Sequence, residues 1–243
     1  MAEIKIAVIN ASTILSDTDV QHVLPALQTQ VTRDFAPQWG IDADLSFIPN
    51  GSQPPPGYWW LTVLDDSDQA GTLGYHDVTE TGLPLGKVFA KTDIADHLQW
   101  SVTASHELLE MLADPAINLS VLVGNTLYAY EVCDSPENEQ FGYNISDVKV
   151  SDFVFPSWFQ PFRTEGAQFD FASHLTAPLQ LLPGGYIGTY DITSGNGWQQ
   201  TTAPGSQLNY QMRPKPGSRR ERRRTPREQW LISKLVNPES LSK

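Results

Sequence analysis

The apolar helical segment 96–113, which carries the ionisable side chains His106, Glu107 and Glu110 among its apolar residues, constrains the fold of this chain most strongly. Its apolar residues recur with helical spacing: Leu98, Val102, Leu108, Leu109, Met111 and Leu112. Pro115 should end the helix, because the residue before a proline is biased away from helical angles. His106, Glu107 and Glu110 stand against this apolar background, and a buried helix carries such groups only when something satisfies them. The segment therefore predicts a helix built around a polar site.

The spacing of these three residues favours a metal. His106 and Glu110 are four residues apart, so their side chains share one helix face and can bind one cation together. Glu107 lies about 100° around the helix from His106, where it can reach a metal-bound water. A carboxylate there can take a proton from that water while the metal lowers the water's pKa towards about 7. We expect His106 and Glu110 to be metal ligands and Glu107 to be catalytic.

A third metal ligand must come from another part of the chain. Glu131, in the expected strand TLYAYEVCD, is the first candidate, and Asp134, Asp114 and Cys133 are its rivals. Strand alternation places Glu131 and Cys133 on one face and Asp134 on the other, so the three are not expected to serve together. The cofactor is expected to be one divalent metal, with zinc favoured. Because the carboxylate of Glu110 is a harder ligand than imidazole, manganese and calcium remain alternatives.

The remaining pattern predicts a mixed α+β fold. A helix is expected over 19–35, and a Gly124-Asn125 turn is expected to join two strands into a hairpin. Residues 65–86 are expected to be rich in turns, and His76 in this stretch is expected to hydrogen-bond in a turn or to line a cleft. The expected strands cover residues 3–9, 42–48, 58–64, 87–91, 119–123 and 127–133.

The order of these segments resembles the core of the zincin metallopeptidases. YWWLTVL, GKVFAKT and SVTASHELLEML follow their order of buried strand, substrate-aligning edge strand and metal-binding helix. The helix over 19–35 and the strand over 42–48 resemble a metzincin-type start. H-E-L-L-E is a variant of the zincin motif H-E-x-x-H. The resemblance implies that His106 is the first ligand, Glu107 the general base, and Glu110 the substitute for the second histidine.

Two further comparisons refine this resemblance. Ala113 and Ala116 stand where metzincins carry a glycine and a third histidine, so that part of the pattern is missing. The string S-H-E-x-L-E-M-L-x-D-P, followed by E-V-C-D, is similar to stretches of a bacterial and phage-type family. The expected fold is thus a zincin-like mixed sheet with a metal-binding active-site helix, followed by a β- and loop-rich C-terminal part.

Charge divides the chain into an acidic body and a basic tail. Residues 213–243 hold ten of the sixteen Lys and Arg but three of the twenty-eight Asp and Glu, a net charge of +7, against −19 for residues 1–212. We expect a zincin-like domain over 1–162, an extension packed on it over 163–212 and a flexible basic tail over 213–243. The tail, especially 213–228, is expected to contact nucleic acid or an acidic surface.

Two function hypotheses follow. The first is a zinc-type hydrolase, peptidase-like, that acts on peptide or protein substrates through Glu107. The second is a non-catalytic zincin-fold protein, structural or binding and particle-associated, that uses its basic tail to hold a partner. No run of 18 apolar residues and no signal-peptide pattern occurs, so a cytoplasmic location without membrane contact is expected, with specialised export or particle association as alternatives.

Overall fold

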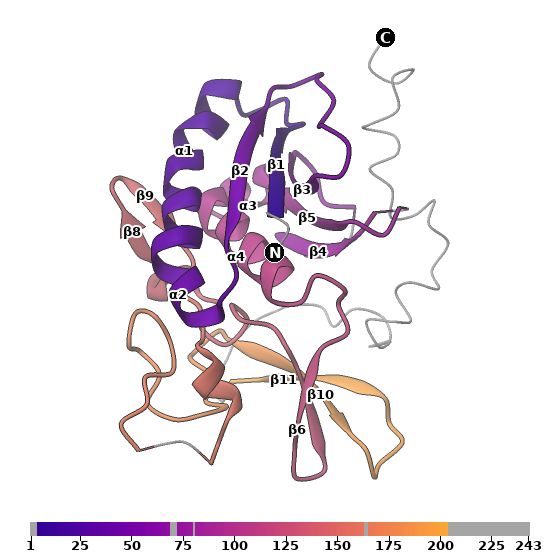
Figure 1. Cartoon of the computed structure of the whole chain (residues 1–243), viewed down its shortest axis with the longest axis vertical. Helices are drawn as coiled ribbons and strands as arrows, with labels where there is room; N and C mark the ends of the chain where they lie inside the picture. Colours follow the sequence, from indigo (N-terminus) through magenta and orange to yellow (C-terminus); the bar gives the residue numbers. More distant parts are fainter. Residues whose placement is uncertain (1–3, 69–71, 80, 163–164, 204–243) are drawn as a thin grey trace.

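A five-stranded mixed sheet forms the upper part of the molecule (Figure 1). The structure, a computed structural model, describes residues 4–68, 72–79, 81–162 and 165–203, so the basic tail 213–243 lies outside the described residues. The strand order is β2-β1-β3-β5-β4, with the first four strands parallel and β4 antiparallel to β5 at the edge. The bounds are β1 Ile4–Asn10, β2 Ala43–Ile48, β3 Trp59–Leu64, β4 Gly74–Val78 and β5 Pro84–Phe89.

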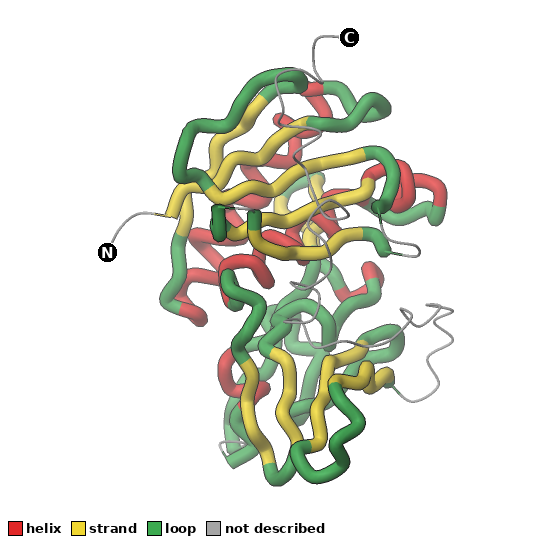
Figure 2. Tube along the Cα trace, turned by 90° about the vertical axis from the view of Figure 1, so that its right-hand side faces the viewer, coloured by secondary structure: helices red, strands yellow, loops and turns green. Residues whose placement is uncertain are grey.

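Helices cover one face of this sheet, as Figure 2 shows. Ser16 caps α1 (Asp17–Thr29) in a capping box with Asp19, which satisfies backbone donors at the helix start. The chain continues through a π-helical turn, η1 (Gln30–Phe35), into α2 (Ala36–Trp39), and stops at Gly40, whose φ of 68° suits glycine. The helices α3 (Ala90–Ala95) and α4 (Trp100–Ala113) follow β5 directly.

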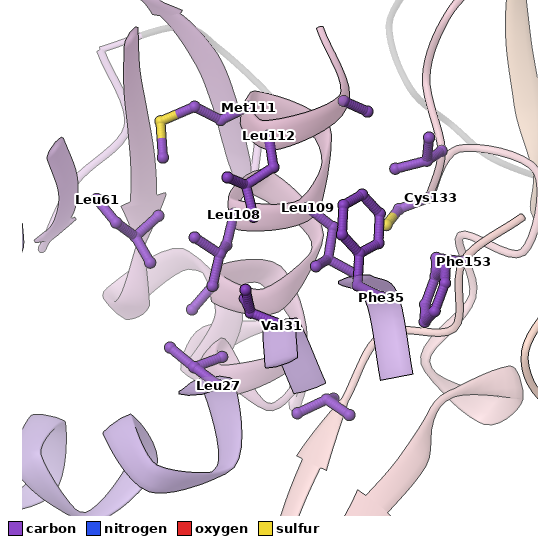
Figure 3. Packing of buried hydrophobic residues seen from close by; sticks show 14 of the residues in the cluster. Leu27, Val31, Phe35, Leu61, Leu108, Leu109, Met111, Leu112, Cys133 and Phe153 are labelled. Carbon is purple, nitrogen blue, oxygen red and sulfur yellow. The ribbon is translucent and has the colours of Figure 1, made fainter. Parts of the chain in front are cut away.

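The helix α4 is buried along nearly its whole length and forms the centre of the core. Leu108 and Leu109 are 0% exposed, and burial of each leucine contributes about 1.5–3 kcal/mol. Figure 3 shows the side chains that surround α4, which come from α1, η1, β3 and the loop after β9: Leu27, Val31, Phe35, Leu61 and Phe153. This packing fixes the rotation of α4 and thereby the direction of its polar side chains.

A second, antiparallel sheet lies below the first and has the order β11-β10-β7-β6 (Figures 1 and 2). The hairpin predicted at Gly124-Asn125 is confirmed, because β6 (Ser120–Val123) pairs with β7 (Thr126–Ala129). The strand β10 (Tyr186–Asp191) pairs with both β7 and β11 (Trp198–Thr202), so these two later strands share a sheet with the hairpin. The remaining short elements are η2 Glu139–Phe141, β8 Tyr143–Ile145, β9 Val148–Val150 and η3 Pro156–Phe159.

The structure confirms a mixed α+β fold and corrects three local predictions. The turn-rich stretch 65–86 contains a strand, β4, and the beginning of β5. The strand predicted over 87–91 runs from Pro84 to Phe89 and lies between β3 and β4, so its expected edge position was wrong. The strand predicted over 127–133 ends at Ala129, because the chain leaves the sheet before Glu131.

Candidate metal centre

His106 and Glu110 point into the same cluster from adjacent turns of α4. His106 Nε2 lies 3.3 Å from Glu110 Oε2. The other carboxylate oxygen, Oε1, accepts a hydrogen bond of 3.1 Å from the backbone N–H of Cys133. The exposed fractions are 7% for His106 and 3% for Glu110, so both groups are shielded from water. The structure therefore brings the predicted pair together, and the hydrogen bond from Cys133 fixes the orientation of the Glu110 carboxylate.

The segment after β7 brings further carboxylates to the same place. Asp134 Oδ1 lies 3.4 Å from His106 Nε2, and Glu137 Oε2 lies 3.1 Å from His106 Nδ1. Glu131 is also buried and faces the cluster. Because the strand ends at Ala129, the alternation expected for residues 131–134 does not apply, and Glu131 and Asp134 both reach the site. The expectation that they would lie on opposite faces was wrong for this reason.

The edge strand β4 supplies a histidine that sequence reasoning did not include among the ligands. His76 Nδ1 lies 3.4 Å from Glu110 Oε2 and 3.7 Å from Glu107 Oε2, and its Nε2 lies 3.6 Å from Glu131 Oε2. His76 is 6% exposed. The structure places His76 on a strand and not in a turn, beside the carboxylates of α4. The strand itself was missed, so no local pattern could direct this side chain towards α4.

Two glycines allow β4 and β5 to approach the polar face of α4. A Cβ atom at Gly74 would lie 2.7 Å from Glu107 Oε1 and 2.8 Å from the backbone oxygen of Lys87. A Cβ atom at Gly86, which pairs with His76 across the sheet, would lie 2.9 Å from a Leu61 methyl and 3.5 Å from the Glu107 Cβ. The contacts at Gly74 are too short for a real Cβ atom, so glycine at this position serves close packing of β4 against Glu107, whereas the 3.5 Å distance from Gly86 is an ordinary contact.

Hydrogen bonds hold α4 in place along its length. Ser105 Oγ donates to the Val102 carbonyl and accepts the backbone N–H of Ser151 at 2.6 Å. Ser101 Oγ donates to the Lys149 carbonyl at 2.7 Å. These bonds tie the helix to the segment around β9, so the site residues sit on a rigid element.

The clustered charges perturb one another. Burial alone would lower the pKa of His106, but the carboxylates of Glu110 and Glu137 outweigh it and raise that pKa well above its usual value. Burial would raise the pKa of Glu110, but the nearby histidines, led by His106, lower it instead. Burial and the neighbouring Glu110 raise the pKa of Asp134 to about 7, and burial also raises the pKa of Glu107. These pKa shifts, upward for most of the groups and downward for Glu110, are typical of a cluster in which several carboxylates lie close together.

The donor set fits a divalent cation. The carboxylates of the cluster are five: Glu107, Glu110, Glu131, Asp134 and Glu137. Two imidazoles, even if both were protonated, would balance only two of these charges. The buried Oε2 of Glu107 accepts no hydrogen bond among the described residues, which is the state expected of an oxygen placed to meet a bound ion or its water. These buried carboxylates and imidazoles could therefore hold a cation.

Two alternative ligands do not join the cluster. Asp114 accepts the backbone N–H groups of Asn118 and Leu119 at 3.0 Å each, so it organises the turn after α4. Burial raises the pKa of the Cys133 thiol well above its usual value, which disfavours the thiolate that a metal would need. Cys133 contributes its backbone N–H to Glu110 instead.

Comparisons with protein-family models, curated proteins and solved structures returned no match. What the site can do therefore follows from its own geometry. In the part of the chain that the structure describes, no helix combines the length and hydrophobicity needed to cross a lipid bilayer.

Proposed function

We propose that this protein is a zinc-type metal-dependent hydrolase with a zincin-like core, that it acts on peptides, and that Glu107 carries the proton. The observation that supports this most directly is the donor set around His106 Nε2, where Glu110 Oε2 lies at 3.3 Å and Asp134 Oδ1 at 3.4 Å. One imidazole and two carboxylates meet there on two different segments. Three nitrogen and oxygen donors from the protein are the number typical of catalytic zinc, whose fourth ligand is water or substrate.

Glu107 is suited to move a proton in this setting. When bound, a divalent cation supplies a water of lowered pKa and polarises a carbonyl group. Glu107 follows His106 on α4 and holds a buried carboxylate inside the cluster, with a pKa raised by that burial. A carboxylate whose pKa lies closer to neutrality accepts a proton and returns it to a leaving amine more readily.

The place of the edge strand also supports a peptide substrate. The zincin resemblance implies an edge strand that aligns an extended substrate beside the metal-binding helix. In this chain that position belongs to β4 instead of 86–92, and β4 borders the cluster through Gly74 and His76. Backbone pairing along such an edge would hold a peptide extended.

The test separates proton transfer from metal binding. Full-length protein, loaded with zinc, is assayed on a mixture of fluorescence-quenched peptides, beside Glu107→Gln and a control, Glu165→Gln, which changes an exposed carboxylate. We expect Glu107→Gln to lose about 10²–10⁴-fold in kcat while its zinc content stays unchanged. The control should match the wild type. Equal hydrolysis by Glu107→Gln and wild type would refute the role of Glu107.

A second candidate function is a non-catalytic metal-binding protein, and burial of the site favours it. His76, His106 and Glu110 are each less than 10% exposed, which resembles a closed structural site more than an open catalytic one. The partner contacts would then come from the basic residues 213–243. Zinc-loaded wild type that binds metal, melts at a higher temperature and cleaves no peptide would support this candidate, and removal of 213–243 would abolish binding to nucleic acid or to an acidic partner.

A further inference from the structure

The cluster contains two sets of ligands. One set is His76, Glu110 and Glu131, and the other is His106, Glu110 and Asp134. Within each set the donor atoms lie within 4.8 Å of one another, and every member of both sets is buried. Glu110 belongs to both sets. We propose that the cluster holds two divalent cations, one in each set, with the Glu110 carboxylate between them.

The geometry around Glu110 supports a shared ligand. Oε2 lies 3.4 Å from His76 Nδ1 and 3.3 Å from His106 Nε2, so an imidazole from β4 and an imidazole from α4 approach the same oxygen. The hydrogen bond from Cys133 N–H to Oε1 keeps the carboxylate from turning away. Carboxylates in this position bridge the ions of two-metal hydrolytic sites, in which the ions lie about 3.5–4 Å apart.

The number of donors exceeds what one zinc-type ion takes. Such an ion binds about four ligands at about 2.0–2.2 Å. The cluster offers two imidazoles and five carboxylates, and these divide by contact. Glu131 lies beside His76, whereas Asp134 and Glu137 lie beside His106. A single ion would leave three of these donors without a cation.

The net charge of the cluster also indicates two ions. Five ionised carboxylates with neutral imidazoles carry −5, which one divalent ion reduces to −3 and two ions reduce to −1. Glu107, whose Oε2 lies 3.7 Å from His76 Nδ1, then carries the one remaining negative charge. A buried cluster that approaches neutrality avoids most of the cost of desolvating charge. The two-ion state is therefore the one that this shielded site can hold with little residual charge.

This inference rests on the proposed function, because it assumes that the cluster binds metal at all. It goes further in giving His76 and Glu131 an ion of their own, which the zincin-type reading of α4 does not require. It also predicts that substitutions on β4 change metal content and not only stability.

The experiment counts the ions and asks whether they are neighbours. Full-length protein is stripped with chelator, titrated with Mn²⁺, separated from free metal, and measured by elemental analysis and electron paramagnetic resonance. Two Mn²⁺ per chain with an exchange-coupled signal are expected for the wild type. His76→Gln should bind one ion and show the six-line signal of an isolated Mn²⁺, and Asp134→Asn should lose the other ion.

A third group of potential ligands provides the control. Asp152, Asp170 and His174 also come within 4.8 Å of one another, at a place where His174 is 37% exposed. His174→Ala should leave two coupled ions in place. Circular dichroism establishes that each variant is folded, and Glu131→Gln replaces His76→Gln if the latter is not.

The outcomes separate the two proposals. One ion per chain in the wild type, two ions without coupling, or loss of an ion in His174→Ala would overturn the two-ion site and leave the hydrolase proposal standing. No bound Mn²⁺ and no bound Zn²⁺ in the wild type would overturn both. Two coupled ions without any peptide cleavage would support the two-ion site and contradict the hydrolase.

Discussion

Asp93 in α3 gives the folded protein a pH dependence that a single substitution should remove. Its side chain is 0% exposed, and Oδ1 accepts a hydrogen bond of 2.8 Å from Thr103 Oγ1 of α4. Burial raises the pKa of Asp93 from 3.8 to about 7, against the opposing effect of the Thr103 hydrogen bond. The folded state therefore holds a proton on Asp93 over a pH range in which the unfolded chain releases it.

The sign and size of the effect follow from linkage. Because the folded-state pKa is raised, the stabilising contribution is complete below pH 3.8, declines as the pH rises, and is lost above about 7. Each tenfold difference in proton affinity is worth about 1.4 kcal/mol, so the full change amounts to about 4 kcal/mol. Asp93→Asn keeps an oxygen acceptor for Thr103 and has no proton to lose. Relative to the wild type, it should gain up to about 4 kcal/mol in unfolding free energy between pH 4 and pH 8.

Urea unfolding followed by tryptophan fluorescence measures this difference. Wild type, Asp93→Asn and the control Asp44→Asn, which changes an exposed carboxylate on β2, are compared near pH 4, 6 and 8 with chelator present. The chelator removes any contribution from bound metal, and other titrating groups cancel in the comparison. The unfolding free energy of Asp44→Asn should change with pH in the same way as that of the wild type. If the unfolding free energy of Asp93→Asn also followed the wild type across this pH range, the argument that burial keeps Asp93 protonated would be refuted.

Two further predictions concern α4 and the proposed metal site. Ser105→Ala should lower the unfolding free energy by about 1–3 kcal/mol in urea titrations, because the buried N–H of Ser151 loses its acceptor, whereas the exposed Ser194→Ala should change little. Zinc at a hundred times its dissociation constant should stabilise the wild type by about 2.7 kcal/mol in thermal melts, and chelator should reverse this. The same zinc concentration should shift the melting temperature of Glu110→Gln far less, and an equal shift would place the zinc elsewhere.

Prediction from the sequence succeeded best for features that depend on residues close together in the chain. The helix α4 ends at Ala113, one residue before Asp114 and two before Pro115, because proline chemistry acts on the adjacent residue. The pairing of His106 with Glu110 follows from helical geometry alone, and the structure places them 3.3 Å apart. Both features depend on residues within one turn of each other, so neighbouring residues suffice to specify them.

The features that sequence reasoning missed depend on distant parts of the chain. His76 reaches the cluster because β4 pairs with β5 in antiparallel register, and this pairing places His76 opposite Gly86. Neither residue carries a local signal for that partnership, since a short strand amid turn residues has weak periodicity. Glu131 and Asp134 converge because the strand ends at Ala129, and element ends are the least predictable part of a sequence pattern.

Burial of the cluster also determines what hydrolysis would require. A substrate carbonyl has to come close to Glu107, which is 5% exposed and lies under β4, where Gly74 and His76 cover it. The helix α4 is held by the hydrophobic core around Leu108 and by the Ser105 hydrogen bonds, so moving α4 would cost more free energy than moving β4. The edge strand β4 has one strand neighbour in the described sheet, β5, and is the element that can shift at lower cost. Catalysis at this site would thus depend on displacement of β4 or rotation of His76, whereas a purely structural metal site would need neither movement.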